Sequence, residues 1–169
     1  LNEDWQTRRY KSEKLWSYRP LKKITIPKNR HPIDHLISKK LAKANLTPAT
    51  PANSRELARR LSFGLTGLPP SPEDLTSFKD ASEYATRLMA TPHYGEHFAQ
   101  HWLDVSRYAD SAGFANDYYR PHAWRYRDYV VRAFNKDKPY PDFVREKIAG
   151  DEISSRSPES LIATGFLRM

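Results

Sequence analysis

Apolar residues recur every three or four positions along most of the chain, with prolines and glycines between the recurring stretches. The first such face consists of Ile33, Leu36, Ile37 and Leu41. Because residues three and four apart share one side of an α-helix, these stretches predict helices. The predicted helices cover 32–41, 54–65, a short helix opening at 71–74, 81–91, 93–110, 122–136, 142–149 and 159–165.

Helix ends are marked as well as helix faces. Asn53 is followed three residues later by Glu56, which is a capping-box pattern, and Gly67 with two prolines after it stops the same helix. No stretch alternates between apolar and polar residues as a strand would. The sequence therefore predicts a mainly α, irregular helical domain with few or no strands.

The first 30 residues show no helical or strand period, although they contain Trp5, Tyr10, Trp16 and Tyr18. We expect residues 1–30 to form a long extended N-terminal arm that lays these rings on the body of the protein. The helical domain is expected over 31–169. A flexible basic tether is the alternative for the arm, and the sequence leaves both open.

Basic residues are concentrated near the N-terminus. The 169 residues carry a net charge of +8, from 28 Lys and Arg against 20 Asp and Glu. Residues 1–60 hold 15 basic and 5 acidic side chains, whereas residues 61–169 hold 13 and 15. A nucleic-acid site would have to lie on the first segment. Its basic residues are dispersed among prolines, so nucleic-acid binding is the least favoured function.

Composition excludes several classes of protein. The chain has no cysteine, so it forms no disulfide, no zinc–thiolate site and no thioether bond to haem. With 4 Trp, 10 Tyr and 7 Phe, it is too rich in large apolar side chains to be disordered. No apolar run is long enough to predict a membrane-spanning helix.

The predicted helix 93–110 has one apolar side and one polar stripe. The apolar side, which we expect to be the buried face, consists of Phe98, Trp102, Val105, Ala109 and Ala112. The polar stripe consists of His97, His101, Asp104, Tyr108 and Ser111, with Arg107 beside it. Such a set could orient a polar ligand or act as acid and base. Spacing alone favours a solvated face held by pairs three and four residues apart.

Residues 93–97 read His-Tyr-Gly-Glu-His, which matches the inverted zinc-protease motif. That motif needs two histidines on one face of a stable helix and a third protein ligand. Here Pro92 starts the helix and Gly95 weakens its first turn. We therefore interpret the match as accidental and expect no metal site.

One arginine interrupts the apolar face of the predicted helix 122–136. Arg127 projects between Val131 and Phe134, and an unpaired buried charge is very costly. The carboxylates that could pair with it are Asp104, Asp110, Asp128 and Asp151. A structural buried ion pair is the favoured interpretation. The alternative is a clamp for an anionic ligand such as a carboxylate or a haem propionate.

The segment 110–125 combines acids, guanidiniums and aromatic rings. It contains Asp110, Asp117, Tyr118, Tyr119, Arg120, His122, Trp124 and Arg125. Such a mixture is typical of a carbohydrate site, and equally of an interdomain contact. Asp104 and Asp110 could form a glycosidase pair, but the sequence does not give their separation.

Several motifs run in a fixed order through the helical region. They are LTGLPP at 65–70, HYGE at 93–96, HWLD at 101–104, RYAD at 107–110, RPHAWRYRD at 120–128, Asn135, Pro139-Tyr140, AGD at 149–151 and ATGFLR at 163–168. Together they resemble the planctomycete cytochrome-c-associated domain of unknown function. The resemblance extends from about Trp16 to the last residue.

The resemblance implies a context rather than an enzymatic activity. Family members are exported proteins that join this domain to an upstream c-type cytochrome domain and a downstream partner domain. In the family the chain continues into a segment with a Cys-x-x-Cys-His sequence, so we expect this chain to be the N-terminal half of the domain. Haem c is expected only in that adjoining region, with His101 or His122 as its neighbour or axial ligand.

The resemblance also marks individual residues. Those that match the family pattern are Asp104, Arg107, Tyr108, Asp110, Arg125, Arg127, Asp128 and Asp151, which with His101 and His122 form the candidate polar cluster. The family usually has Gln where Lys147 stands. The first functional hypothesis is an exported redox, electron-transfer or haem-proximal module, with the C-terminal part of the protein and a c-type cytochrome domain as partners. The alternative is a polysaccharide-binding or carbohydrate-active module that uses residues 104–128.

Overall fold

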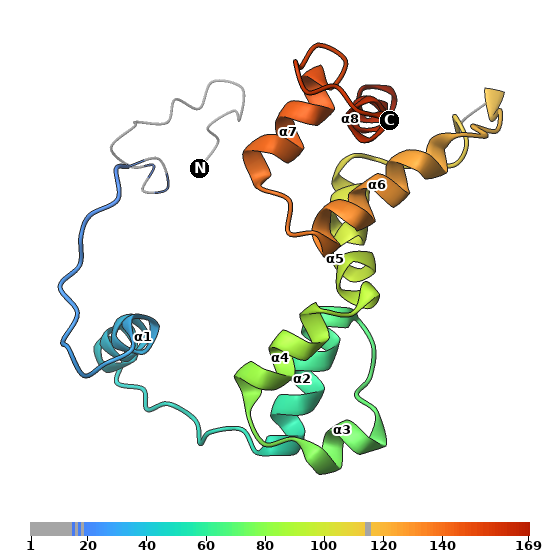
Figure 1. Ribbon diagram of the computed structural model, residues 1–169. Coiled ribbons are helices and arrows are strands. Elements are labelled where there is room, and N and C mark those ends of the chain that lie inside the picture. The colour runs from blue at the N-terminus through green and yellow to red at the C-terminus, as the bar shows by residue number, and fades with distance from the viewer. Residues whose placement is uncertain (1–14, 16, 18, 114–115) are drawn as a thin grey trace, which may run out of the picture. The chain divides into compact units, whose positions relative to one another are not determined.

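Eight α-helices make up most of what the computed structural model describes, which is residues 15, 17, 19–113 and 116–169 (Figure 1). They are α1 Pro32–Lys43, α2 Ser54–Thr66, α3 Pro72–Ser77, α4 Ala81–Met89, α5 Pro92–Val105, α6 Ala123–Asn135, α7 Tyr140–Ala149 and α8 Pro158–Ala163, followed by the 3-10 helix η4 Thr164–Arg168. The β pairing in the described residues is a single antiparallel bridge between Ser111 and Tyr119. The mainly α prediction is confirmed.

The chain divides into two units, residues 1–50 and residues 51–169. The described part of the first unit contains α1, and residues 20–27 before it carry no helix or strand, as the predicted arm requires. Residues 1–14, 16 and 18 of the arm lie outside the described residues. The contact of its aromatic rings with the body and the boundary at residue 30 therefore stay predictions.

The core of the second unit is built around α5 and α6, which pack against each other (Figure 1). Its buried side chains are Ala99, Tyr126, Tyr129, Val130, Ala133, Phe143 and Ala163. Aromatic rings dominate it: Tyr129 stacks on Phe143 with ring centroids 5.9 Å apart, and Trp102 meets Phe143 edge-on at 5.0 Å. The Trp102 indole N–H also donates to the Tyr126 hydroxyl at 3.0 Å. The core is thus large rings rather than aliphatic side chains.

A smaller cluster of Ala58, Tyr84 and Leu88 joins α2 to α4. The predicted capping box is present at the start of α2. The Asn53 side chain accepts from the Glu56 N–H at 2.9 Å, and the Glu56 carboxylate accepts from the Asn53 N–H at 3.1 Å. Gly67 ends the helix at φ 70°, a left-handed conformation that glycine adopts without a steric penalty. Both ends of this helix were readable from the sequence.

Helix α5 ends at Val105, five residues before the predicted end at 110. Arg107 has φ 55°, in the left-handed region, so the backbone leaves the helix there. The buried side of α5 consists of Gly95 and Ala99 and leads to Ser106, whereas Val105 is 77% exposed. The prediction that Val105, Ala109 and Ala112 continue one buried helical face is therefore wrong.

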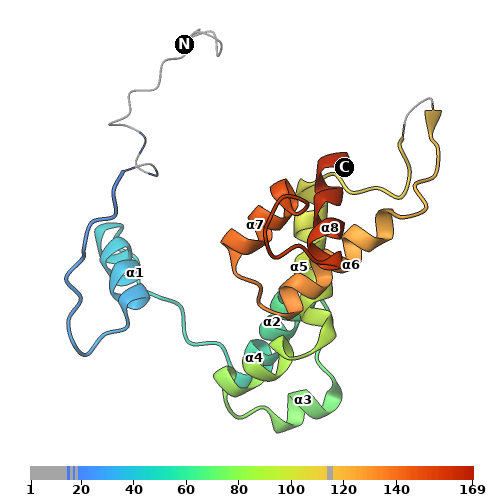
Figure 2. The same cartoon turned by 45° about the horizontal axis from the view of Figure 1, so that its top comes forward.

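Helices α7 and α8 attach the C-terminal segment to the core. Figure 2 shows α8 beside both α6 and α7, which agrees with the contacts between these helices. The Ser160 hydroxyl on α8 donates to the Gly150 carbonyl at the end of α7, at 2.8 Å. This arrangement brings η4 close to the start of α6.

Candidate functional site

A loop, residues 106–122, connects α5 to α6. Ser111 and Tyr119 pair across it, and the N–H of Gly113 donates to the Asp117 carboxylate at 2.9 Å. Hydrogen bonds from Ser111 and from that N–H hold the pKa of Asp117 below its usual value. Asp117 therefore fixes the loop as a charged acceptor. Tyr118 and Tyr119 are left with 62% and 68% of their surface exposed.

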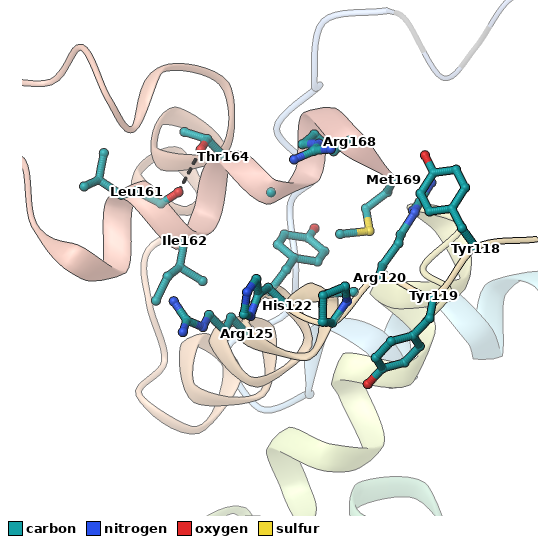
Figure 3. Close-up of a pocket in the computed structure, with 14 residues that line it drawn as sticks. Tyr118, Tyr119, Arg120, His122, Arg125, Leu161, Ile162, Thr164, Arg168 and Met169 are labelled. Carbon is teal, nitrogen blue, oxygen red and sulfur yellow. Dashed lines mark hydrogen bonds between the residues drawn. The ribbon is translucent and has the colours of Figure 1, made fainter. Parts of the chain in front are cut away.

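An open pocket of about 520 Å³ lies between this loop, the start of α6, and the α8–η4 segment (Figure 3). Its lining residues are Tyr118, Tyr119, Arg120, Pro121, His122, Ala123, Arg125, Tyr126, Leu161, Ile162, Thr164, Gly165, Arg168 and Met169. Two segments that are far apart in sequence therefore form one site.

Local contacts explain why these segments meet. The Arg120 N–H donates to the Asp110 carbonyl at 2.8 Å, which holds the loop at the start of α6. On the opposite wall, a Cβ added to Gly165 would lie 3.2 Å from the Tyr126 Cβ. A residue without a side chain at 165 therefore allows η4 to approach α6 closely.

The pocket is positively charged. Figure 3 shows the guanidinium groups of Arg120, Arg125 and Arg168 on different sides of it. No Asp or Glu side chain lines the pocket, and none of these three arginines forms an ion pair within the described part of the chain. The first turn of α6 carries no acidic residue, so the positive end of its helix dipole is unopposed. Guanidinium groups without a partner favour an anionic ligand.

The structure places only two of the ten predicted site residues, His122 and Arg125, in this pocket. Four others lie together in a separate group. The Tyr108 hydroxyl donates to the Asp110 carboxylate at 2.6 Å, and the Arg127 guanidinium donates to Asp128 at 2.9 Å. Burial, the hydrogen bond to Asp110 and its negative charge raise the pKa of Tyr108. Tyr108 therefore stays protonated and donates to Asp110.

The remaining four predicted residues, His101, Asp104, Arg107 and Asp151, are exposed. None of them makes a side-chain hydrogen bond or an ion pair within residues 19–113 and 116–169. The ring of His101 meets that of His97 edge-on, with centroids 5.3 Å apart. His101 is not among the residues that line the pocket with His122, so the two histidines do not share it.

The prediction that Arg127 is buried is wrong. Its side chain is 44% exposed and pairs with the neighbouring Asp128, one of the four carboxylates considered. The buried face of α6 runs through Tyr126, Val130 and Ala133. Arg127 lies about 100° around the helix from Tyr126, at the edge of that face. Solvent therefore reaches the guanidinium.

A basic side chain is buried elsewhere: Lys147 on α7 is 2% exposed. Its Nζ has no hydrogen-bond partner among the described residues and lies 3.4 Å from the Trp102 ring centroid and 3.2 Å from that of Phe143. Burial lowers the pKa of this amine to about 6. The sequence contained one signal for it, because Phe143 and Lys147 are four residues apart and share a helix face.

The His-Tyr-Gly-Glu-His motif forms an ordinary surface pair. His93 Nδ1 and Glu96 Oε2 are 2.9 Å apart and both side chains are more than half exposed. The His97 ring faces Phe98 and His101 instead. In the residues that the structure describes, no three His, Asp or Glu side chains are arranged to hold a metal ion, and no helix is long and apolar enough to cross a membrane.

The fold and the pocket define a helical module with an open pocket lined by three arginines. The chain belongs to the PSCyt2 family, described as a protein of unknown function (DUF1549), whose model matches residues 32–169. The family resemblance read from the ordered motifs is thereby confirmed. Neither a curated protein nor a solved structure matches the chain.

Proposed function

We propose that the second unit binds an acidic polysaccharide, one that carries carboxylate or sulfate groups, in the pocket between α6 and η4. The observation that carries this proposal is a set of three guanidiniums that form no ion pair with the described residues, around a pocket that no Asp or Glu side chain lines. Exposed tyrosine rings beside them offer flat surfaces for sugar rings. The pocket is open and large enough for one or two sugar units, in keeping with the few hundred Å³ typical of ligand sites.

The same geometry favours binding over glycoside hydrolysis. Hydrolysis of this kind uses two carboxyl groups on either side of the scissile bond. Asp110 accepts from the Tyr108 hydroxyl, Asp104 is exposed on α5, and neither lines the pocket. We therefore propose that the pocket binds a carbohydrate without hydrolysing it.

Isothermal titration with polygalacturonate oligomers, using neutral dextran oligomers for comparison, tests the proposal. We expect binding of the acidic oligomer alone, weakening as salt rises because charge carries it. Arg125→Gln and Arg168→Gln should each lower the association constant about tenfold, since each removes a hydrogen bond between charged groups. The matched control is Arg55→Gln, an exposed arginine on α2.

Two results would contradict the polysaccharide proposal. One is equal binding of acidic and neutral oligomers. The other is an equal loss of affinity in Arg55→Gln and Arg125→Gln, because only Arg125 lines the pocket.

A haem-proximal role is the second candidate, favoured by the presence of His122 in the same pocket as the three arginines. A haem supplies one-electron chemistry when bound. Here His122 would be its neighbour or axial ligand, and the guanidiniums would pair with propionates. Because the chain has no cysteine, the haem would have to be attached elsewhere. His101 lies outside this pocket and is not part of the proposal.

A haem peptide released from cytochrome c tests this candidate. We expect the chain to shift its Soret band and His122→Ala to abolish the shift, whereas His101→Ala should leave it unchanged. An unshifted spectrum at saturating protein would reject the haem-proximal role.

The exported location, the c-type cytochrome partner and a continuation of the chain are proposals that rest on the family resemblance alone.

A further inference from the structure

Helix α1 presents an apolar face that no described residue of the first unit covers. It buries none of its 12 residues, and Ile33, Leu36 and Ile37 are 59%, 40% and 51% exposed. A helix of this length is marginal in water without a packing partner. A surface that covers the face would therefore stabilise α1.

Positive charge surrounds this face. The described residues of the first unit carry one acid, Asp34, and eight basic side chains: Arg19, Lys22, Lys23, Lys28, Arg30, Lys39, Lys40 and Lys43. Lys39 and Lys43 lie along one edge of the apolar face, and Lys40 lies within it. A long lysine stem can lie on apolar surface while its ammonium reaches a polar layer.

The stretch before α1 repeats this combination of apolar and basic side chains. Leu21 is fully exposed and Ile24 is 56% exposed, with Lys22 and Lys23 between them. Apolar anchors interleaved with lysines are typical of segments that lie at a lipid–water interface.

We propose that residues 19–46 bind the surface of an anionic lipid bilayer. In this arrangement α1 lies in the plane of the interface, Ile33, Leu36 and Ile37 enter the acyl region, and the lysines contact anionic headgroups. The site differs from the pocket of the second unit and would operate whether or not that pocket binds a polysaccharide.

Charge decides between an anionic bilayer and the second unit as the surface that covers this face. Residues 51–169 hold 16 basic and 16 acidic side chains, so that unit offers no net negative charge to the first. A nucleic acid would satisfy the lysines but would leave the apolar face uncovered. An anionic bilayer satisfies both.

Co-sedimentation of the full chain with vesicles tests the proposal. We expect binding to vesicles of phosphatidylglycerol and phosphatidylcholine, and none to phosphatidylcholine alone. Replacing Ile33 and Ile37 with Ser should lower the partition coefficient at least about tenfold. The matched control replaces Val105 and Ile148, two exposed apolar residues of the second unit, with Ser and should change nothing.

A second series tests the charges. Replacing Lys39, Lys40 and Lys43 with Gln should lower binding at least about tenfold, and Arg55, Lys79 and Lys136 replaced with Gln provide the control. Binding that is insensitive to either the Ile or the Lys series would overturn the proposal. So would capture of an acidic protein without any binding to anionic vesicles.

Insertion can be observed directly because the chain has no cysteine to compete for a label. An environment-sensitive dye on Leu36→Cys should shift to the blue with anionic vesicles, while the same dye on Ser38→Cys, on the other side of α1, should shift less. A blue shift at Leu36→Cys without vesicles, abolished when the second unit is unfolded in urea, would show that α1 packs on its own chain. That result would overturn the proposal, and it does not depend on whether the Ile and Lys variants of α1 fold correctly.

Discussion

Replacing Lys147 with Met is expected to raise the free energy of unfolding by about 2–4 kcal/mol at neutral pH. The Lys147 amine is buried without a hydrogen-bond partner among the described residues. Contact with the Trp102 and Phe143 rings returns about 2 kcal/mol when the amine is charged, which is less than the cost of removing the charge from water. Met has a similar shape and no charge to bury.

The same amine makes stability depend on pH. Its pKa is about 6 in the folded protein against 10.5 as the reference value, so between these two values the unfolded chain binds the extra proton. Stability therefore rises with pH across that window, and below about pH 6 Lys147 destabilises the fold by a constant amount that no longer changes with pH. Urea unfolding at pH 6, 7.5 and 9 should show the advantage of Lys147→Met shrinking as pH rises.

Two further variants isolate the charge from the shape. Lys147→Gln keeps a polar group without a charge, so it should remove this pH dependence while gaining less stability than Lys147→Met. Lys79→Met changes an exposed lysine and should stay within about 0.5 kcal/mol of the parent. A Lys147→Met protein less stable than the parent would mean that the ammonium has a favourable partner, and would contradict this account.

Gly150→Ala is expected to lower the free energy of unfolding by about 2–4 kcal/mol. The backbone of Gly150 has φ −63° and ψ −20°, which any residue adopts, so the penalty is purely steric. An added Cβ would lie 2.0 Å from the Ser160 carbonyl oxygen. The obstacle is backbone, so α8 would have to move away from α7, and the hydrogen bond from the Ser160 hydroxyl to the Gly150 carbonyl would be lost.

Gly64→Ala is the matched control, because nothing lies within 4 Å of a Cβ at that position in α2. There the same change should stabilise the protein by about 0.5–1 kcal/mol, since alanine favours the helix. Thermal unfolding by circular dichroism measures both variants. A Gly150→Ala protein that is as stable as the parent or more stable would show that the α7–α8 approach is looser than the structure has it.

The presence of the helices and the positions where they start could be predicted from neighbouring residues. Which helix faces are buried, and which residues line the pocket, could not. The capping box at Asn53 and the stop at Gly67 are formed by neighbouring residues, so the sequence contains all of the information. The end of α5 depends on Arg107 adopting a left-handed conformation, which a non-glycine residue does rarely and without a local signature. Because the sequence predicted a helix to 110, Val105 was expected to share a buried face with Ala109 and Ala112. The helix ends at Val105, and this side chain is exposed.

The pocket could be predicted only in part. His122 and Arg125 lie in the unusual segment that drew attention in the sequence, and they do line the pocket. Arg168 and Met169 form the opposite wall through a tertiary contact between η4 and α6, which no short-range pattern encodes. Arg127 shows the same limit, because its place at the edge of the buried face of α6 exposes the guanidinium. The burial of Lys147 depends on the packing of α7 against the Trp102 ring of α5, which is likewise a tertiary contact.

In the loop between α5 and α6, the residues that can contact a ligand differ from the residues that stabilise the fold. Tyr118 and Tyr119 in this loop are exposed and are not part of the buried core, which is formed by α5–α8. The loop is held by backbone pairing and by the hydrogen bond from Gly113 to Asp117, neither of which depends on the tyrosine side chains. Mutations at Tyr118 and Tyr119 can therefore change ligand preference at little cost to the stability of the scaffold. Related proteins could diverge in specificity at these positions while retaining one helical body.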